Sequence, residues 1–241
     1  MTQRLAQQIL QPSPSLPLAG YEAEVSQARR RYAAEIYRLQ EARDWVGLSE
    51  LAEHLDVSAQ AVSRMVRRMK DEGYLNHEAY RGVRLTASGT AIGLPAIRRH
   101  RLVEVFLVQV MGYGWEEIHD LADVLDRGVD GALEDRIDEL TGHPTRCPHG
   151  DPIPTRDGVM PILEDTSLVA FRSGTQGTVS RIRTHDAAKL RYLREVGLVP
   201  GVRFHLVGCG PFNGPLRLTY EGHDVILGHE LAETIWAEPA A

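Results

Sequence analysis

The sequence predicts a mainly α-helical protein with a small β domain at its C-terminal end. Three observations support this fold class. Apolar residues recur at helical spacing between residues 21 and 140, two short helices and a hairpin follow in the order of a winged helix-turn-helix, and short β-type runs appear after residue 163. With 241 residues, 43% hydrophobic and 25% charged, the chain has the length and composition of a globular protein of two or three domains.

The N-terminal region starts with residues 1–20, which we expect to form a flexible tail. Residues 11–17 are proline-rich, and such sequence favours extended backbone. Helical spacing begins near Tyr21. After a break at residues 44–47, Ser49 is expected to cap the next helix, because a serine hydroxyl can accept a hydrogen bond from a free N–H of the first turn.

The next two elements complete the winged helix-turn-helix, assigned to residues 21–94. Ser58 is expected to cap a helix that ends at Gly73. A hairpin follows, with strands at residues 74–78 and 83–85. In this geometry the second helix enters the major groove and the hairpin forms the wing.

Exposed polar residues near the start of that helix can reach base edges, and cations further along it and in the wing can meet phosphates. The candidates are Ser58, Gln60, Ser63, Arg64, Arg67, Arg68, Lys70, Tyr80, Arg81 and Arg84. Any single arginine could be an ordinary solvated residue. The combination of helix, turn, helix and basic wing favours double-stranded DNA as a partner.

The charge distribution agrees with two separate tasks, although the chain as a whole carries a net charge of −6. Residues 25–101 hold 14 Lys and Arg against 9 Asp and Glu, whereas residues 102–150 hold 3 against 11. A basic block suits phosphate contact, and an acidic block suits cation binding or a partner. Chance clustering of solvated faces is the alternative.

Other classes of protein are disfavoured. A run of about 20 apolar residues, as a membrane span needs, is missing from the sequence, and the N-terminus lacks the pattern of a signal peptide. Two cysteines cannot form a disulfide framework, so a reducing cytoplasm is the expected location.

The middle and C-terminal regions differ in their periodicity. We expect helices at residues 86–111, with a kink at Pro95, and at residues 115–126 and 131–140, followed by a linker. Beyond the linker, a helix at residues 186–196 lies among five short runs typical of strands, which suggests a small barrel. The predicted strands are residues 168–171, 177–182, 202–207, 216–220 and 224–227.

Histidine and carboxylate side chains in the middle region have the spacing of metal ligands. Two helices each present such groups at i, i+4 spacing, and the linker adds a thiol and an imidazole. The candidates are His100, Glu104, His119, Asp123, Asp126, Cys147 and His149. Nitrogen and oxygen ligands suit Mn²⁺ or Fe²⁺, and the thiol also accepts Zn²⁺ and other divalent transition metals. Taken singly, each residue is better explained as a solvated or packing side chain.

Several motifs in order resemble the diphtheria toxin repressor family of iron- and manganese-dependent regulators, in its longer, three-domain type. They lie at residues 33–37, 62–66, 82–86, 99–102, 147–150 and 193–201. The resemblance implies a winged helix-turn-helix at 21–94, a helical metal-binding and dimerisation domain at 95–145, a linker at 146–163 and an SH3-like β-barrel at 164–241.

The resemblance also implies two neighbouring metal sites. The first would be formed by His100, Glu104, His119, Cys147, His149 and Asp186. Lys189 stands where iron-type members have a ligating amide, and His185 is a candidate replacement. Asp123 and Asp126 match the second site.

The rest of the second site departs from the family pattern. Arg127, Arg31 and Ala34 stand where the family has ligands, and a guanidinium has no lone pair to give. This site is therefore absent, built from other groups such as Glu35, or replaced by salt bridges from Arg127 or Arg31.

The function implied by the resemblance is repression of transcription. A homodimer would bind a palindromic operator when loaded with Mn²⁺ or Fe²⁺, with neither a membrane nor a small-molecule substrate involved. Two alternatives are a metal-independent winged-helix regulator and, less favoured, a metalloenzyme. The sequence contains no His-Glu-x-x-His motif and no nucleophile signature, so we expect no enzymatic activity.

Overall fold

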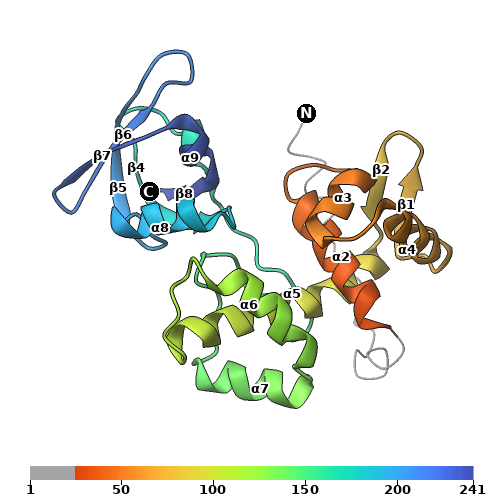
Figure 1. The fold of residues 1–241 in the computed structure, drawn as a ribbon. Coiled ribbons are helices and arrows are strands. Elements are labelled where there is room, and N and C mark those ends of the chain that lie inside the picture. The colour runs from red at the N-terminus through yellow and green to blue at the C-terminus, as the bar shows by residue number, and fades with distance from the viewer. Residues whose placement is uncertain (1–24, 241) are drawn as a thin grey trace. The chain divides into compact units, whose positions relative to one another are not determined.

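The computed structural model describes residues 25–240, which fall into two compact units divided between Ala96 and Ile97 (Figure 1). The predicted tail at residues 1–20 and the predicted helix start at Tyr21 lie outside the described residues. In the part of the chain that is described, no helix combines the length and apolar character required to cross a membrane.

The first unit is a winged helix-turn-helix. Its elements are α2 (Gln27–Gln40), α3 (Leu48–Leu55), α4 (Ala59–Asp71), β1 (Leu75–Glu78), β2 (Gly82–Leu85) and the start of α5 (Ala87–Gln109). The Ser58 hydroxyl accepts a hydrogen bond from Ala61 N, as the predicted cap requires. The predicted cap at Ser49 is wrong, because Gly47 holds the cap position and α3 begins at Leu48, two residues earlier than predicted.

The helices and the wing of this unit share one hydrophobic core, which includes the fully buried Ile36, Leu51 and Met69. The wing is fixed to the segment before α3 by a bridge between Val46 and Val83. Gly82 has a φ of +109°, and a Cβ there would lie 2.1 Å from Val46 O. Glycine is therefore required where the wing passes this backbone.

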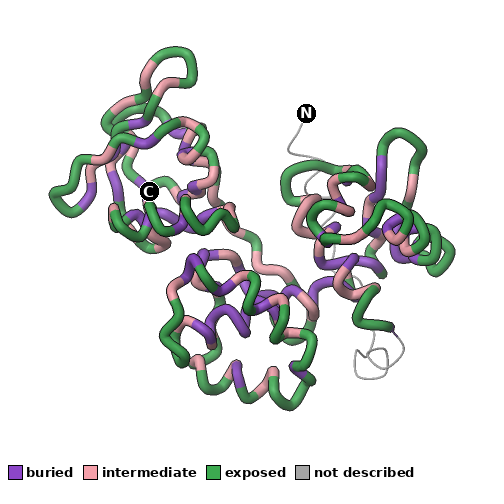
Figure 2. Tube along the Cα trace, in the orientation of Figure 1, coloured by how far each residue is buried: buried purple, intermediate pink, exposed green. Residues whose placement is uncertain are grey.

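The helical part of the second unit contains the remainder of α5, then α6 (Ile118–Leu125), a short 3₁₀ turn (Asp126–Gly128) and α7 (Gly131–Leu140). Helix α5 continues through Pro95. Helix α6 starts at Ile118 rather than at the predicted Trp115, whose backbone carbonyl instead accepts a hydrogen bond from His149. Buried residues of α5, α6 and α7 form the core beneath these helices (Figure 2).

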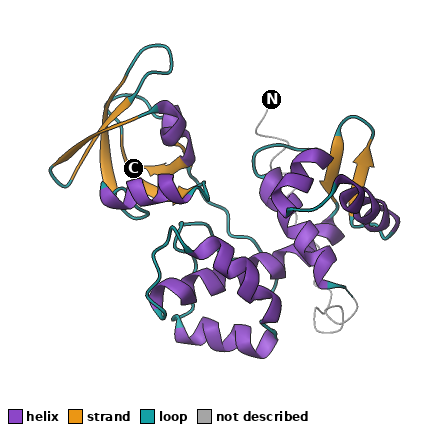
Figure 3. Cartoon of the chain, in the orientation of Figure 1, coloured by secondary structure: helices purple, strands orange, loops and turns teal. Residues whose placement is uncertain are grey.

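The β domain, residues 166–239, is one antiparallel sheet with strand order β3-β8-β4-β5-β6-β7, consistent with an SH3-like fold (Figure 3). The strands are β3 (Thr166–Ser167), β4 (Gln176–Ile182), β5 (Arg203–Cys209), β6 (Leu216–Tyr220), β7 (His223–Leu227) and β8 (Ile235–Pro239). Helices α8 (Ala187–Glu195) and α9 (His229–Thr234) complete it.

Four of the five predicted strands and the predicted helix are confirmed in this domain. The strand predicted at residues 168–171 is wrong, because Leu168–Ala170 form a 3₁₀ turn that buries Leu168 in the core. Strand β8 and helix α9 were not predicted. Each has only five or six residues, too few for periodicity to distinguish them from a loop.

Candidate metal centre and nucleic-acid interface

Three imidazoles surround one buried carboxylate in the second unit. Glu104 and His100 lie one turn apart on α5 and are each 3% exposed, and His119 projects from α6. Oxygen Oε1 of Glu104 lies 3.3 Å from His100 Nε2, 3.5 Å from His119 Nδ1 and 3.6 Å from His149 Nδ1. Side chains up to 49 residues apart in sequence thus meet at a single oxygen atom.

The loop after α7 supplies two members of this cluster. Cys147 and His149 are both buried, and ligand atoms of Glu104, Cys147 and His149 all lie within 4.8 Å of one another. Ligand atoms of His100, Glu104 and His119 likewise all lie within 4.8 Å of one another. The structure therefore brings together the five residues that the sequence predicted for the first site on helices and linker.

Asp123 and Asp126 lie on the other side of His100. Its Nδ1 is 3.2 Å from Asp123 Oδ1 and 3.1 Å from Asp126 Oδ2, and these three residues form a third group of possible ligands. His100 thus faces carboxylates with both ring nitrogens. Residues predicted for the two separate sites therefore meet at this imidazole.

Electrostatics favour a negative carboxylate at the centre of the cluster. Burial alone would raise the pKa of Glu104, but hydrogen bonds and charge from His100, together with hydrogen bonds from His119 and His149, hold its pKa well below the ordinary value. Burial lowers the pKa of His149, yet the hydrogen bond and charge of Glu104 outweigh it and the pKa is raised. A charged carboxylate therefore remains at the centre at neutral pH.

The thiol of Cys147 is protonated in the metal-free protein. Burial raises its pKa well above the usual value, and the negative charges of Glu104 and Asp151 add to this effect. Such a thiol is inert as a nucleophile. A divalent cation would reverse the preference, because a coordinated thiol loses its proton.

The donor set fits a transition-metal ion. It combines imidazole nitrogens, carboxylate oxygen and a thiol in a buried pocket, the chemistry that such ions prefer. The carbonyl oxygen of Trp115 can only accept, so the 2.8 Å contact places a proton on His149 Nε2. The Nδ1 atom faces Glu104, so loss of its proton to an incoming ion would leave a lone pair there for coordination. This outer contact, not predicted from the sequence, orients a ligand.

The β domain contributes residues next to the cluster. The His185 ring stacks on His119 with centroids 3.6 Å apart. Asp186, the predicted ligand, caps α8 through Oδ1, which accepts hydrogen bonds from Ala188 N and Lys189 N. It belongs to none of the three ligand groups found among the described residues. Lys189 pairs with Glu230 at 2.6 Å.

Residues considered for the second site have other contacts within their own units. Arg31 donates to Leu55 O at 3.1 Å. Glu35 pairs with Arg38 and with His54.

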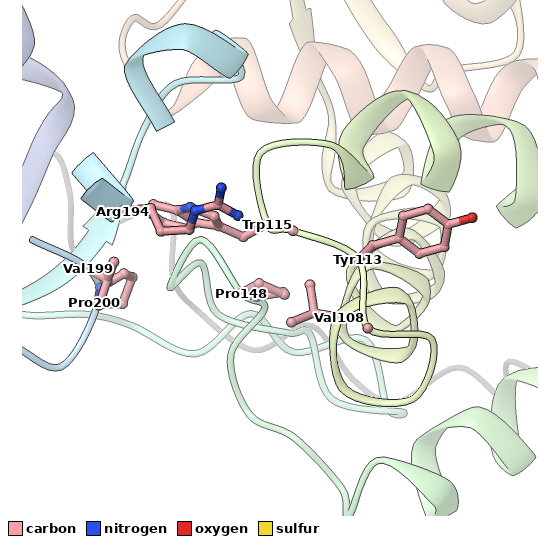
Figure 4. Close-up of a pocket in the computed structure, with 9 residues that line it drawn as sticks. Val108, Tyr113, Trp115, Pro148, Arg194, Val199 and Pro200 are labelled. Carbon is pink, nitrogen blue, oxygen red and sulfur yellow. The ribbon is translucent and has the colours of Figure 1, made fainter. Parts of the chain in front are cut away.

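A hollow of about 540 Å³ lies beside the cluster, against the end of α5 and the segment after α8 (Figure 4). Its lining is mostly apolar and includes Val108, Tyr113, Trp115, Pro148, Val199 and Pro200. At its edge Arg194 pairs with the buried Glu116 at 2.7 Å. The lining contains no histidine, cysteine or carboxylate, so the metal-binding chemistry lies outside the hollow.

The candidate DNA-reading residues lie on the exposed side of α4, opposite its buried stripe. Gln60, Arg64, Arg67 and Lys70 are all exposed. Ser63 Oγ donates to Ala59 O. Arg68 is also exposed but pairs at 3.2 Å with Glu72, which pairs with Arg29 as well.

The wing presents Tyr80 at its tip. Tyr80 is fully exposed with a φ of +64°. Arg81 pairs with Glu78 at 3.1 Å and lies over the ring of Trp45 at 4.6 Å, and Arg84 is half-buried. Arg68 of α4 and Arg81 of the wing thus already form ion pairs within this unit.

Three family models match the chain in succession. Residues 25–83 match the N-terminal DNA-binding domain of iron-dependent repressors, and residues 86–155 match the metal-binding and dimerisation domain of the same proteins. Residues 166–239 match the FeoA domain.

Known proteins resemble the chain over most of its length. The iron-dependent repressor IdeR of Mycobacterium tuberculosis is 31% identical over 228 residues, which cover 89% of this chain and 98% of the relative. The regulator MntR of Oceanobacillus iheyensis is 35% identical over 112 residues, covering 46% of this chain and 76% of MntR. A solved manganese-dependent transcriptional repressor in complex with manganese matches with a TM-score of 0.82 and 38% identity, covering 88% of this chain and all of that one.

Proposed function

We propose, on the premise that this chain belongs to the iron-dependent repressor family, that it is a transcriptional repressor whose binding to DNA depends on a divalent metal ion. The observation that carries this proposal is the convergence of three imidazoles and a thiol on the buried carboxylate of Glu104. A second observation supports it: the same chain carries a winged helix-turn-helix whose helix α4 exposes Arg64, Arg67 and Arg68.

We assign five ligands to the principal ion: His100, Glu104, His119, Cys147 and His149. The burial of Glu104 and its low pKa supply a fixed negative charge for a cation. Asp186 completes the proposed set, with the carboxylate oxygen that does not cap α8 reaching the ion. The stack of His185 on His119 supports this, because it brings the start of α8 to the cluster.

Asp123 and Asp126 have two possible roles. They can hold a second ion, or their oxygens can accept a hydrogen bond from His100 Nδ1–H and so orient Nε2 toward the principal ion. The contacts of 3.1 and 3.2 Å favour the second role for the metal-free protein. Counting the bound ions in wild-type protein and in Asp123→Ala separates the two.

The physiological ion is proposed to be Mn²⁺ or Fe²⁺. Oxygen and nitrogen ligands suit both ions, while Zn²⁺ would bind the same groups, and more tightly than either by the usual order of affinity. Selection in the cell would then follow from metal availability and from the geometry of the site.

The active form is proposed to be a homodimer on a palindromic operator. Helix α6 and the two residues just after α5 expose large apolar side chains, namely Val110, Met111, Leu121, Val124 and Leu125. Apolar surface of this kind marks a protein interface. A twofold dimer would present two copies of α4 to two half-sites.

Operator binding measured with and without metal tests this function. An operator is first selected from randomised duplex DNA in the presence of Mn²⁺. Affinity is then measured by fluorescence anisotropy with Mn²⁺, Fe²⁺, Zn²⁺ or chelator, and bound ions are counted per subunit. We expect tight binding only with metal. Equal affinity in chelator would select the metal-independent regulator instead.

A further inference from the structure

Two of the proposed ligands lie on one tight loop, residues 146–152, which we call the ligand loop. A bridge between Arg146 and Pro152 closes it. Inside it, Cys147 N donates to Asp151 O and Gly150 N donates to Cys147 O, each at 2.9 Å. The positions of Cys147 Sγ and His149 Nδ1 therefore depend on what holds the loop as a whole.

Strand β4 of the β domain holds the main chain of this loop. Ile182 N donates to His149 O at 2.8 Å. Gly150 has a φ of +91°, and a Cβ there would lie 2.1 Å from Ser180 O and 2.7 Å from Arg181 Cα. Loop and strand are thus in direct backbone contact, with no space for a side chain between them.

A chain of charges holds the loop from both sides. Asp151 lies 3.3 Å from Arg181 of β4 and 3.9 Å from Arg101 of α5, and Arg101 also donates to Pro152 O at 2.5 Å. Arg181 pairs with the buried Asp165 as well, at 2.9 Å. The helix that carries His100 and Glu104 is thereby connected through the loop to β4.

We propose that β4 positions the ligand loop, with Gly150 and Arg181 as positioning residues, so that the β domain sets metal affinity through this contact as well as through any ligand of its own. The inference rests on the proposed function, because it concerns the ion held by Glu104, Cys147 and His149. Groups that orient metal ligands from outside typically change metal affinity by about 10- to 100-fold when they are replaced.

Two glycine variants test the backbone contact. Gly150→Ala must push the loop away from β4. Gly158→Ala is the matched control: its φ of +75° gives similar backbone strain, but no atom lies within 4 Å of its Cβ position. Mn²⁺ affinity is measured by competition with a chelating fluorophore. We expect Gly150→Ala to weaken binding at least about tenfold and Gly158→Ala to leave it near wild type.

Arg181→Gln separates positioning from electrostatics by the sign of the effect. Removing a positive charge near a cation site would by charge alone tighten Mn²⁺ binding. If Arg181 positions the loop, binding weakens instead. Affinity is measured at a temperature where circular dichroism shows each variant to be folded.

A measurement on the wild-type protein needs no variant. Ile182 N donates to His149 O, so an ion bound at His149 should slow hydrogen exchange at the Ile182 amide, because coupling between two sites is reciprocal. Exchange at Ile182 that is unchanged by Mn²⁺, together with variants that bind as tightly as wild type, would overturn the inference. Wild-type protein that binds no Mn²⁺ would overturn the proposed function, and this inference with it.

Discussion

The metal cluster and the DNA-reading helix are built in opposite ways. Side chains of the cluster are buried, except for the partly buried His119, and come from α5, α6 and the ligand loop, so that the site exists only when these elements pack. The side chains of α4 that are proposed to face DNA are exposed and come from a single helix. A substitution in the cluster should therefore abolish the response of DNA binding to metal. A substitution on the helix should instead weaken DNA binding in proportion to the contact that is lost.

The largest expected effect is that of Glu104→Gln. The substitution keeps the shape of the side chain but removes the negative charge that three imidazoles face. We expect Mn²⁺ affinity, measured by competition with a chelator, to fall by more than about 100-fold. Metal should then no longer stimulate operator binding. An unchanged response to metal would refute the assignment of Glu104 as the central ligand.

Arg64→Ala should have a smaller, graded effect. Arg64 is exposed near the start of α4, where a guanidinium can contact a base edge. We expect a loss of about 1–3 kcal/mol in operator binding and weaker discrimination at one base pair. Anisotropy titrations against single-base operator variants measure both. Mn²⁺ affinity is the control and should stay at the wild-type value.

The pH dependence of metal binding sharpens the comparison further. The pKa values of Cys147 and His149 are raised, so both groups tend to carry protons that an ion must displace. The pKa of Glu104 is lowered, so it releases none. Affinity should rise with pH near neutrality by about tenfold per unit for each proton released. Cys147→Ser should release one proton fewer and so reduce this slope by about tenfold in affinity per pH unit. A slope equal to that of wild type would exclude the thiol as a ligand.

The smallest difference is expected between two neighbouring arginines. Arg67 should contact phosphate, so that Arg67→Ala lowers the salt dependence of binding by about 0.9 in log–log slope. Arg68 already pairs with Glu72, so Arg68→Ala should lower the slope less. Titrations over a range of salt concentrations measure the two slopes. A larger change for Arg68 would reverse their proposed roles.

Local features of the sequence predicted most of the fold. The cap at Ser58, the helix that follows it and the strand at residues 216–220 are all determined by residues close in sequence, and these predictions are confirmed. The prediction failed where elements are short or determined by distant contacts. Ile235–Pro239 forms a strand because β4 and β3 pair with it, and its own five residues carry too weak a pattern.

The candidate site was predicted as a set of side chains but not as an arrangement. Spacing placed His100 with Glu104, the linker added Cys147 and His149, and family resemblance added Asp186. The supports of the site are largely backbone groups, Trp115 O and Ile182 N, and any residue type can provide these. Gly150 was the one residue in the sequence that hinted at these backbone contacts, because a glycine beside ligands indicates close approach of another chain segment.

The position of His100 between two groups of acids has a consequence for how many ions the protein can hold. A neutral imidazole has one ring nitrogen with a free lone pair and one that carries a hydrogen. If His100 Nε2 binds an ion beside Glu104, Nδ1 must therefore carry the hydrogen. An ion at Asp123 and Asp126 would have to bind without His100, or force the ring to become a bridging imidazolate. Occupancy of one side therefore raises the free-energy cost of occupying the other.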